Sequence, residues 1–320
     1  MALNCFLCPN NCKIEDGYFG VCGVRGAVDG RFNLPYNGLI SAISTDPVEK
    51  KPLYHFHPGK TIFSIGFFGC SLSCPFCQNY RISKEFPAPS DAEPKSPSQI
   101  VDAALKSGSF GIAYTYSEPL IHYEWLLECL KTARTAGLKN ILVTNGYINP
   151  EPASELITYI DAVNIDLKSF SEDFYQDVLK GRLQPVKDFI TLASKHTHTE
   201  ITTLVIPDKN DSEEELEQAA GFIAGLGKSI PWHLSAYYPS YKYNQRPTAP
   251  EQLISLAEKV SKQLNFVYTG NIAGGISDTL CPVCGNKLII RTGYRTLTSG
   301  ISSGKCTGCR TDVSSFGIIL

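Results

Sequence analysis

The sequence predicts an α/β fold built on a parallel sheet. From residue 61 onward, short apolar runs alternate with amphipathic segments. The apolar runs are nearly continuous, as in strands that are buried on both faces. Repeated strand–helix units imply right-handed crossovers, which leave a partial barrel, a full barrel and an open sheet as alternatives. The expected strands are 61–66, 110–114, 140–144, 161–166, 200–206, 233–237 and 265–269.

Helical segments lie between these strands. Residues 98–107 carry apolar side chains at helical spacing, with Ser96 or Ser98 as the cap. Residues 120–136 do the same and stop before a glycine, a suitable residue to end a helix. The acidic residues that follow Asp211 belong in a first helical turn, where the helix dipole favours them.

Length and composition narrow the class of protein. A chain of 320 residues is long enough for one large domain with small appendages. Its 29 basic and 31 acidic residues nearly cancel, which gives no electrostatic reason to expect nucleic acid or a membrane surface as a partner. No apolar run approaches the roughly 20 residues that span a bilayer. The N-terminus lacks the basic flank and apolar core of a secretory signal, so we expect a cytoplasmic protein.

The cysteines fall into groups. Twelve cysteines would suggest disulfides in a small secreted chain, but their ligand-like spacing in a reducing cytoplasm indicates metal binding. Cys129 stands apart on an expected helix, where burial as a small apolar residue is the default. The three groups are Cys5, Cys8, Cys12 and Cys22; Cys70, Cys74 and Cys77; and Cys281, Cys284, Cys306 and Cys309.

The middle group comes directly after the first expected strand and is incomplete. Cys70, Cys74 and Cys77 have the spacing C-x3-C-x2-C, with no fourth cysteine nearby in the sequence. Iron–sulfur cubes normally take four cysteines. A cube held by three thiolates has one iron open to a substrate or cofactor. The missing ligand therefore indicates chemistry rather than structural support.

This motif resembles the signature of the radical S-adenosylmethionine (SAM) superfamily, in which an aromatic residue such as Phe76 precedes the third cysteine. The resemblance implies a [4Fe–4S] cluster whose open iron binds the amino and carboxylate groups of SAM. An electron from the cluster breaks the C5′–S bond, and the 5′-deoxyadenosyl radical takes a hydrogen atom from the substrate. A zinc knuckle completed by His55 or His57 is the alternative, but such knuckles usually offer paired C-x2-C units.

Polar residues after the next strands match other segments of this family. Residues 114–119 resemble its Gly-Gly-Glu-Pro-type segment, with Tyr116 and Ser117 in place of the glycines. Residues 143–146 and 166–168 resemble the Thr-Asn-Gly and Asp-Leu-Lys segments of glycyl-radical-enzyme activases. The cofactor contacts that the resemblance implies are Phe76, Ser117, Glu118, Thr144, Asn145, Asp166 and Lys168.

Simpler explanations exist for some of these residues. Glu118 is alternatively a solvated carboxylate at a helix start, and Asp166 with Lys168 a surface ion pair. Placement at strand ends, where one common site would lie, favours cofactor contact.

Two further residues complete the expected site. Activases often carry an arginine on the fifth strand, where this chain has Thr202 or Thr203, and we assign the cofactor contact to Thr203. His233, on the sixth strand, either contacts cofactor or substrate or is a satisfied core residue; we include it among the cofactor contacts.

A narrower resemblance covers roughly residues 4–272. The segments 46–59, 70–79 and 113–119 look like those of AmmeMemoRadiSam-system radical enzymes, relatives of pyruvate formate-lyase activating enzyme. The resemblance does not supply the physiological substrate.

The terminal cysteine groups have complete ligand sets. The C-terminal group has the spacing C-x2-C-x21-C-x2-C of zinc ribbons and rubredoxins, so we expect zinc, with a single iron as the alternative. The N-terminal group has the spacing C-x2-C-x3-C-x9-C, for which structural zinc is the first expectation and an auxiliary iron–sulfur cluster the second.

Together these observations predict a partial (β/α)6-type barrel over residues 61–276. A metal-binding region built on four cysteines is expected over 1–60, and a zinc-ribbon or rubredoxin-like module over 277–320. The expected function is radical SAM chemistry on a small-molecule or peptide substrate. A glycyl-radical-enzyme activase is the alternative within this class, and a non-catalytic zinc-binding interaction module is the alternative outside it.

The expected chemistry also needs partners. A low-potential electron donor of the flavodoxin or ferredoxin type would reduce the cluster, and the substrate or protein partner is not indicated by the sequence. We expect neither nucleic acid nor a membrane as a partner.

Overall fold

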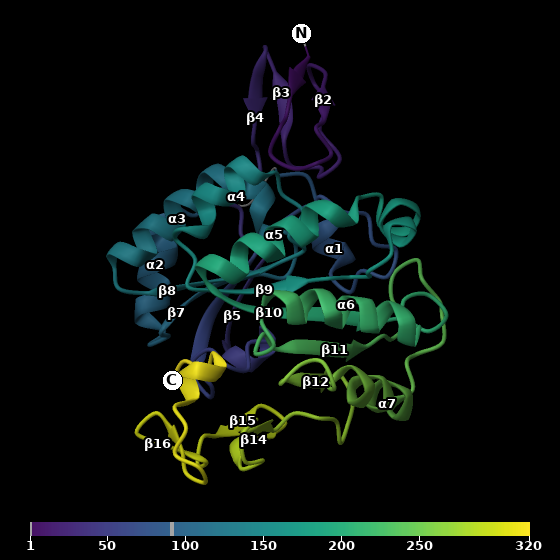
Figure 1. Ribbon diagram of the computed structural model, residues 1–320. Helices are drawn as coiled ribbons and strands as arrows, with labels where there is room; N and C mark the ends of the chain where they lie inside the picture. Colours follow the sequence, from purple (N-terminus) through teal and green to yellow (C-terminus); the bar gives the residue numbers. More distant parts are fainter. Residues whose placement is uncertain (1, 90–92) are drawn as a thin grey trace.

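The computed structural model describes residues 2–89 and 93–320. Within these residues the main sheet has eight strands in the order β12-β11-β10-β9-β8-β7-β6-β5 (Figure 1). Strands β6 to β12 are mutually parallel, and β5 is antiparallel to β6. This arrangement confirms the predicted α/β partial barrel. The bounds are β5 (Ala42–Pro47), β6 (Thr61–Gly66), β7 (Gly111–Thr115), β8 (Lys139–Thr144), β9 (Ala162–Asp166), β10 (His198–Val205), β11 (Trp232–Ala236) and β12 (Val267–Gly270).

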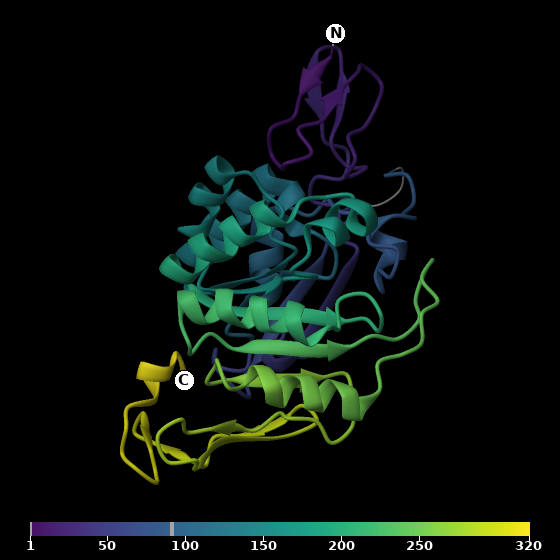
Figure 2. The same ribbon diagram turned by 45° about the vertical axis from the view of Figure 1, so that its right-hand side comes forward.

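Helices cover the outer face of the sheet, as the two ribbon views show (Figures 1 and 2). The start of the helix at 97–106 follows the expected signal, because the Ser96 hydroxyl accepts from the Gln99 N–H and the Gln99 side chain accepts from the Ser96 N–H. The helical bounds are η1 (Val48–Lys50), α1 (Tyr80–Ser83), α2 (Pro97–Lys106), η2 (Pro119–His122), α3 (Tyr123–Thr135), α4 (Pro150–Ile157), the π-helical η3 (Phe174–Leu179), α5 (Leu183–His196), α6 (Glu213–Leu226), α7 (Pro250–Val260) and η4 (Val313–Phe316).

Strand β5 was not expected from the sequence. Its residues alternate between more and less exposed positions, and Ile43 is 56% exposed. The segment Ala-Ile-Ser-Thr-Asp-Pro therefore lacks the continuous apolar run that identifies the buried parallel strands. Because β5 lies at the edge and pairs antiparallel along the whole of β6, it supports the strand that leads into the cysteine triplet.

Small sheets form a module at each end of the chain. The N-terminal module stands at one end of the molecule, and the C-terminal module lies at the other, beyond β12 (Figure 1). The N-terminal strands are β1 (Leu3–Asn4), β2 (Lys13–Ile14), β3 (Gly26–Val28) and β4 (Arg31–Asn33). The C-terminal strands are β13 (Thr279–Leu280), β14 (Lys287–Thr292), β15 (Arg295–Leu297), β16 (Ile301–Ser302) and β17 (Lys305–Cys306).

The C-terminal module is packed firmly on the barrel. Phe266, which directly precedes β12, and Tyr268, within it, share one hydrophobic cluster with residues of this module, including Leu288. Near the C-terminus, the N–H of Ile319 donates to the carbonyl of His55 at 2.8 Å. A displacement of this module should therefore alter the packing at β12, the strand at the edge of the barrel.

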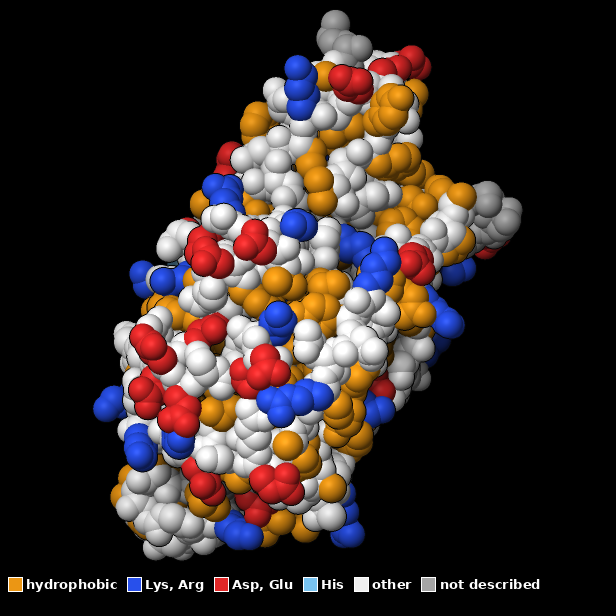
Figure 3. All heavy atoms as spheres, turned by 90° about the vertical axis from the view of Figure 1, so that its right-hand side faces the viewer, with side chains coloured by type: hydrophobic (Ala, Val, Ile, Leu, Met, Phe, Trp, Pro, Cys, Tyr) orange, Lys and Arg blue, Asp and Glu red, His pale blue; other side chains and the backbone are white. Residues whose placement is uncertain are grey.

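The surface agrees with the neutral composition. Acidic and basic side chains are interspersed over the face drawn in Figure 3, so this face offers no continuous basic patch for nucleic acid. In the described part of the chain, none of the helices is long and apolar enough to cross a membrane.

Two buried histidines predict how stability depends on pH. Burial lowers the pKa of His55 to about 3 and that of His122 to about 4. Both stay neutral in the folded state at pH 5, whereas in the unfolded chain they take up protons below about pH 6.5. Stability is therefore lost as pH falls from 7 towards 5, by about 2 kcal/mol for each histidine. Urea unfolding at pH 7 and pH 5 would measure the difference.

A variant isolates the contribution of one histidine. His55→Gln should lose its share of the pH dependence, about 2 kcal/mol between pH 7 and pH 5. His196→Gln, at an exposed position on α5, should keep the full dependence. Equal pH dependence in His55→Gln and the wild type would contradict the assignment.

Candidate functional site

The cysteine triplet lies in the loop that leaves β6. Cys70, Cys74 and Cys77 all line one cavity of about 450 Å³. The Asn145 side-chain amide lies 3.5 Å from the Cys70 sulfur, and the Ser83 hydroxyl lies 3.2 Å from the Cys77 sulfur. The sequence-predicted triplet is thus brought to the mouth of the barrel with polar groups beside its sulfurs.

Glu118 is buried beside this triplet rather than solvated. Its carboxylate accepts from the N–H groups of Leu120 and Asn145 at 3.0 and 2.9 Å, and from the Thr144 hydroxyl at 2.6 Å. Burial raises the pKa of Glu118 to about 7. Because a carboxylate offers about four lone-pair directions, Glu118 retains acceptor capacity towards the cavity that it lines.

The segment before Glu118 keeps the backbone shape that glycine would favour. Tyr116 has φ of +68°, in the left-handed region that side chains rarely adopt. Its carbonyl accepts from the Asn79 side-chain amide, and its hydroxyl donates to Asp46 at 2.8 Å. Ser117 lines the cavity and donates its hydroxyl to the Phe67 carbonyl at 2.8 Å. The missing glycines therefore change the side chains of this segment without removing its turn.

An ion pair lines the same cavity as Glu118. Lys168 Nζ is 3.0 Å from an Asp166 oxygen, and both residues line the cavity after β9. Burial opposes the charge of Lys168, but Asp166 and Cys74 raise its pKa above the ordinary value. The cavity thus contains a cationic Nζ close to the cysteine triplet.

The neighbouring strand requires one correction. Thr203 was expected to contact the cofactor, but its hydroxyl donates to the Leu167 carbonyl at 2.7 Å and accepts from Trp232, away from the cavity. Thr202 lines the cavity instead, as does Leu204. Successive residues of a strand point to opposite faces, so the choice between the two threonines depended on a register that the sequence did not give.

Two other expected cofactor contacts differ in the same respect, because one lines the cavity and the other does not. Phe76 is buried, lines the cavity and packs against Phe174 and Tyr243. Thr144 does not line the cavity and instead supports Glu118 through its hydroxyl. Thr144 therefore acts on the site through Glu118.

Glu200 is a site residue that the sequence did not reveal. Its carboxylate accepts from the backbone N–H groups of Tyr54 and His55 at 2.9 and 2.8 Å. It also bonds to the Nε2 atoms of His198 and His233, at 2.9 and 2.6 Å. Burial opposes ionisation, but the bonds from the two histidines hold the pKa of Glu200 well below its ordinary value.

This carboxylate orients His233 in the cavity. With Nε2 bonded to Glu200, the His233 ring lines the cavity near β11. The signal in the sequence was the charged Glu200 in a strand, two positions before Thr202 and therefore on the same face.

A second cavity of about 920 Å³ adjoins the first. It lies between the loop after β12 and the C-terminal module, and it includes the glycines Gly274 and Gly275. The residues that line both cavities are Tyr54, Gly270, Asn271 and Tyr294.

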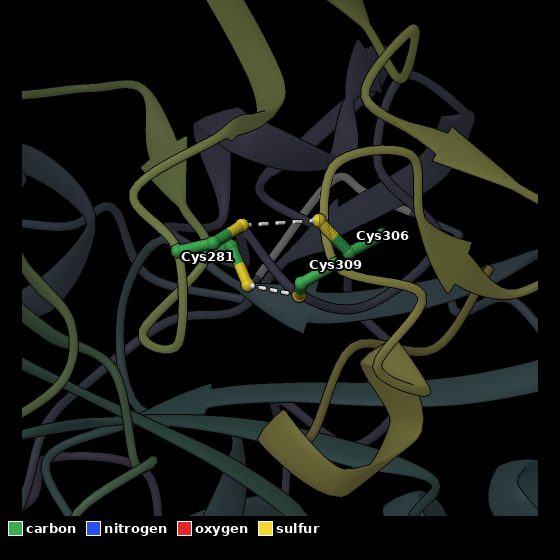
Figure 4. A group of neighbouring side chains, drawn as sticks. Cys281, Cys306 and Cys309 are labelled. Atoms are coloured by element: carbon green, nitrogen blue, oxygen red, sulfur yellow. Dashed lines mark hydrogen bonds between the residues drawn. The ribbon is translucent and has the colours of Figure 1, made fainter.

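The C-terminal thiols form a compact group (Figure 4). The sulfurs of Cys281 and Cys309 are 3.6 Å apart, and those of Cys284 and Cys306 are 3.7 Å apart. All four sulfurs lie within 4.8 Å of one another. The N–H of Cys309 lowers the pKa of the Cys306 thiol, whereas burial and the neighbouring thiols raise that of Cys284, so full ionisation of the group requires a bound metal.

Comparisons with known proteins place the chain in a family. Residues 64–220 match the model of the Radical SAM superfamily. Uncharacterized protein MJ0808 of Methanocaldococcus jannaschii is 36% identical over 294 residues, which cover 90% of this chain and 87% of that protein. The chain belongs to the radical SAM superfamily. This confirms the resemblance carried by Cys70, Cys74 and Cys77, and it makes the protein an enzyme rather than a non-catalytic module.

Two other similarities concern named radical SAM proteins. The pyruvate formate-lyase-activating enzyme of Clostridium pasteurianum is 23% identical over 185 residues, which cover 55% of this chain and 77% of that enzyme. A radical SAM methyltransferase from Sphaerobacter thermophilus superimposes with a TM-score of 0.52 at 14% identity, covering 69% of this chain and 71% of that structure. The second likeness shows the fold alone.

The residues present fit the cofactors of this family. Burial raises the pKa of the Cys74 thiol to about 11 and also raises that of Cys70, so thiolates here require a positive partner such as iron. The cavity volume falls within the range of about 300–1,000 Å³ common for small-molecule sites. Glu118 and Lys168 add an acceptor and a cation for the charged groups of SAM.

Proposed function

We propose that this radical SAM enzyme cleaves SAM and abstracts hydrogen from a small-molecule or peptide substrate. The cluster, when bound, supplies the electron that divides SAM into methionine and a 5′-deoxyadenosyl radical, and that radical takes the hydrogen atom. The supporting observation is the second cavity, which continues from the first and provides room beyond the cofactor.

Side chains that line the cavity would bind the cluster, SAM and the substrate. Cys70, Cys74 and Cys77 hold three irons. Glu118 accepts from the ammonium group of SAM, and the charge of Lys168 attracts its carboxylate. His233, fixed by Glu200, contacts whatever occupies the space between the two cavities.

The substrate would enter beside the C-terminal module. The wall common to both cavities contains Tyr54 and Tyr294, whose rings offer apolar contact, and Asn271, whose amide donates to the Ala236 carbonyl at 3.0 Å. A compact molecule or a peptide segment would fit this passage.

Deuterium transfer tests the proposal. Anaerobically reconstituted enzyme, reduced with dithionite, is incubated with SAM and deuterated candidate substrates, and the 5′-deoxyadenosine is analysed by mass spectrometry. Deuterium in the product identifies the substrate. Absence of 5′-deoxyadenosine from protein with a full iron complement would overturn the proposal.

A glycyl-radical-enzyme activase is the second candidate. The similarity to the pyruvate formate-lyase-activating enzyme favours it, as does the glycine-like backbone at Tyr116. An activase would generate a glycyl radical signal in a partner protein by electron paramagnetic resonance. With either function, a low-potential donor of the flavodoxin or ferredoxin type would provide the electron.

Glu118→Gln tests the proposed contact with SAM. The change removes the charge and sets an NH2 group against a neighbouring donor, Leu120 N–H or Asn145 N–H. A hydrogen bond to a charged group contributes about 1.5–3 kcal/mol, so SAM should bind about 10–100-fold more weakly. Calorimetric titration of the reconstituted enzyme with SAM measures the dissociation constant.

The control makes the same Glu-to-Gln change at an exposed position. Glu217→Gln, at an exposed position on α6, should bind SAM like the wild type. Equal affinity in Glu118→Gln and Glu217→Gln would refute the assigned contact.

We also propose that the C-terminal thiols hold zinc. Tetrahedral coordination with Zn–S bonds of about 2.3 Å places neighbouring sulfurs about 3.8 Å apart. The observed separations of 3.6 and 3.7 Å fit that geometry. Metal analysis should give one zinc per chain at this group.

A further inference from the structure

The N-terminal cysteines lie at the interface with the barrel. Cys5, Cys8 and Cys22 are buried, and Cys12 is partly exposed. The module is closed by a hydrogen bond from the Cys5 N–H to the Cys12 carbonyl at 2.9 Å. Cys8 lies near enough to the other three cysteines for their charges to interact. These cysteines therefore face one common site.

Their sulfurs are more widely spaced than those of the C-terminal group. In residues 2–89 and 93–320, the C-terminal thiols are the only group of three or more ligand side chains with all ligand atoms within 4.8 Å. Neither the N-terminal four nor Cys70, Cys74 and Cys77 reach that compactness. A single tetrahedral ion needs sulfurs about 3.8 Å apart, whereas a cluster of several irons holds its thiolates farther apart. By this measure the N-terminal group resembles the triplet.

The two groups touch through their own ligand residues. The Cys70 N–H donates to the Cys22 carbonyl at 3.4 Å, and the Asn10 amide donates to the Ser71 carbonyl at 2.8 Å. Gly69, with φ of +79°, permits this approach, because a Cβ there would lie 2.5 Å from the Cys22 carbonyl oxygen. One hydrogen bond thus links a ligand of the N-terminal site to a ligand of the triplet.

Donors surround the N-terminal site as they would an anionic cluster. The Val21 N–H donates to the Cys12 sulfur at 3.5 Å. Arg25 interacts electrostatically with Cys5, and within the described residues its buried Nε finds no hydrogen-bond partner. The other guanidinium nitrogens of Arg25 are held by Glu124 at 2.7 Å. Arg25 and Cys5 lie close enough for a side-chain hydrogen bond, so the Cys5 thiolate of a bound cluster would satisfy this donor.

We propose that Cys5, Cys8, Cys12 and Cys22 bind a second iron–sulfur cluster, which passes electrons to the cluster at Cys70, Cys74 and Cys77. The proposal rests on the proposed radical SAM function. One electron from a low-potential flavodoxin or ferredoxin reduces the N-terminal cluster. The same electron then leaves it for the triplet cluster, and no atoms are exchanged.

The test separates the two clusters by mutation and metal analysis. A Cys70→Ala, Cys74→Ala, Cys77→Ala variant is reconstituted anaerobically with iron, sulfide and zinc. It should retain about four irons if the N-terminal cluster is a cube, together with a paramagnetic resonance signal after reduction. A Cys12→Ser, Cys22→Ser variant should lose that signal and keep the signal of the triplet cluster. Zinc without iron at the N-terminal site of the triplet variant would overturn the proposal.

A second measurement addresses electron transfer and misfolding. In the Cys12→Ser, Cys22→Ser variant, flavodoxin-driven formation of 5′-deoxyadenosine should fall at least about tenfold relative to dithionite-driven formation. An unchanged ratio would refute the relay. Because iron and sulfide are also counted in the unmutated protein, two clusters per chain must be found there even if a variant fails to fold. Wild-type protein that forms 5′-deoxyadenosine with one cluster per chain would refute the second cluster alone.

Discussion

Cys74→Ala is expected to reduce 5′-deoxyadenosine formation by at least about 10³-fold, equivalent to about 4 kcal/mol of activation free energy. Cys74 is buried close to Cys77 and Lys168, and its loss leaves only two of the three cysteine ligands of the triplet. The variant should also lose the iron of the triplet cluster. Product analysis by liquid chromatography and iron analysis per chain measure both effects.

Cys129→Ala provides the matched control. Cys129 is fully buried on α3, and its sulfur lies 3.5 Å from the Tyr114 hydroxyl, far in sequence from any ligand group. This variant should keep its iron and its activity with a small loss of stability. Full activity in Cys74→Ala would contradict the assignment of the triplet.

Much of the barrel could be predicted because its strands are buried on both faces. The expected strand at 61–66 coincides with β6, and 140–144 differs from β8 by one residue. Edge strand β5 could not be found in the same way, because only one of its six residues is buried and its sequence contains no apolar run. The π-helical turn at 174–179 likewise has no local signal, since its shape depends on what packs around it.

The site was predictable where a spacing or motif fixes the chemistry. The triplet, Glu118 and the Asp166–Lys168 pair do line one cavity. The choice between Thr202 and Thr203 required the strand register, and the role of Glu200 required contacts between residues about 145 positions apart in the chain. Such long-range partners cannot be read from local pattern.

The C-terminal module, which contains the proposed zinc site, also contacts residues that line the proposed substrate site. The Thr296 hydroxyl donates to the buried Glu49 carboxylate at 2.7 Å, and an Arg291 nitrogen donates to the Tyr54 carbonyl. Both Glu49 and Tyr54 line the cavity of the cysteine triplet. We therefore expect loss of the proposed zinc to disturb the hairpin of β14 and β15 and, through it, the cavity wall at Tyr294.

Cys306→Ala is accordingly expected to remove one zinc and to unfold the C-terminal module. Structural zinc contributes about 10–16 kcal/mol of apparent binding free energy in small zinc-finger peptides, far more than this short module can replace by packing. Amide exchange over residues 279–320 should become fast while the barrel core stays protected. Product formation with the identified substrate should fall more than SAM cleavage without it, because the module contributes only Tyr294 to the cavity of the triplet but forms much of the second cavity.

Two variants decide whether the metal or the mutation itself causes this loss. Zinc accepts ligand sets of three cysteines and one histidine, so Cys306→His should retain zinc and much of the slow exchange, whereas Cys306→Ala should not. Ser302→Ala, at an exposed position on β16, should behave like the wild type. Slow exchange in zinc-free Cys306→Ala would show that packing against Phe266 and Tyr268 holds the module without metal. In that case the structure of the cavity wall at Tyr294 would not depend on metal binding by the thiols.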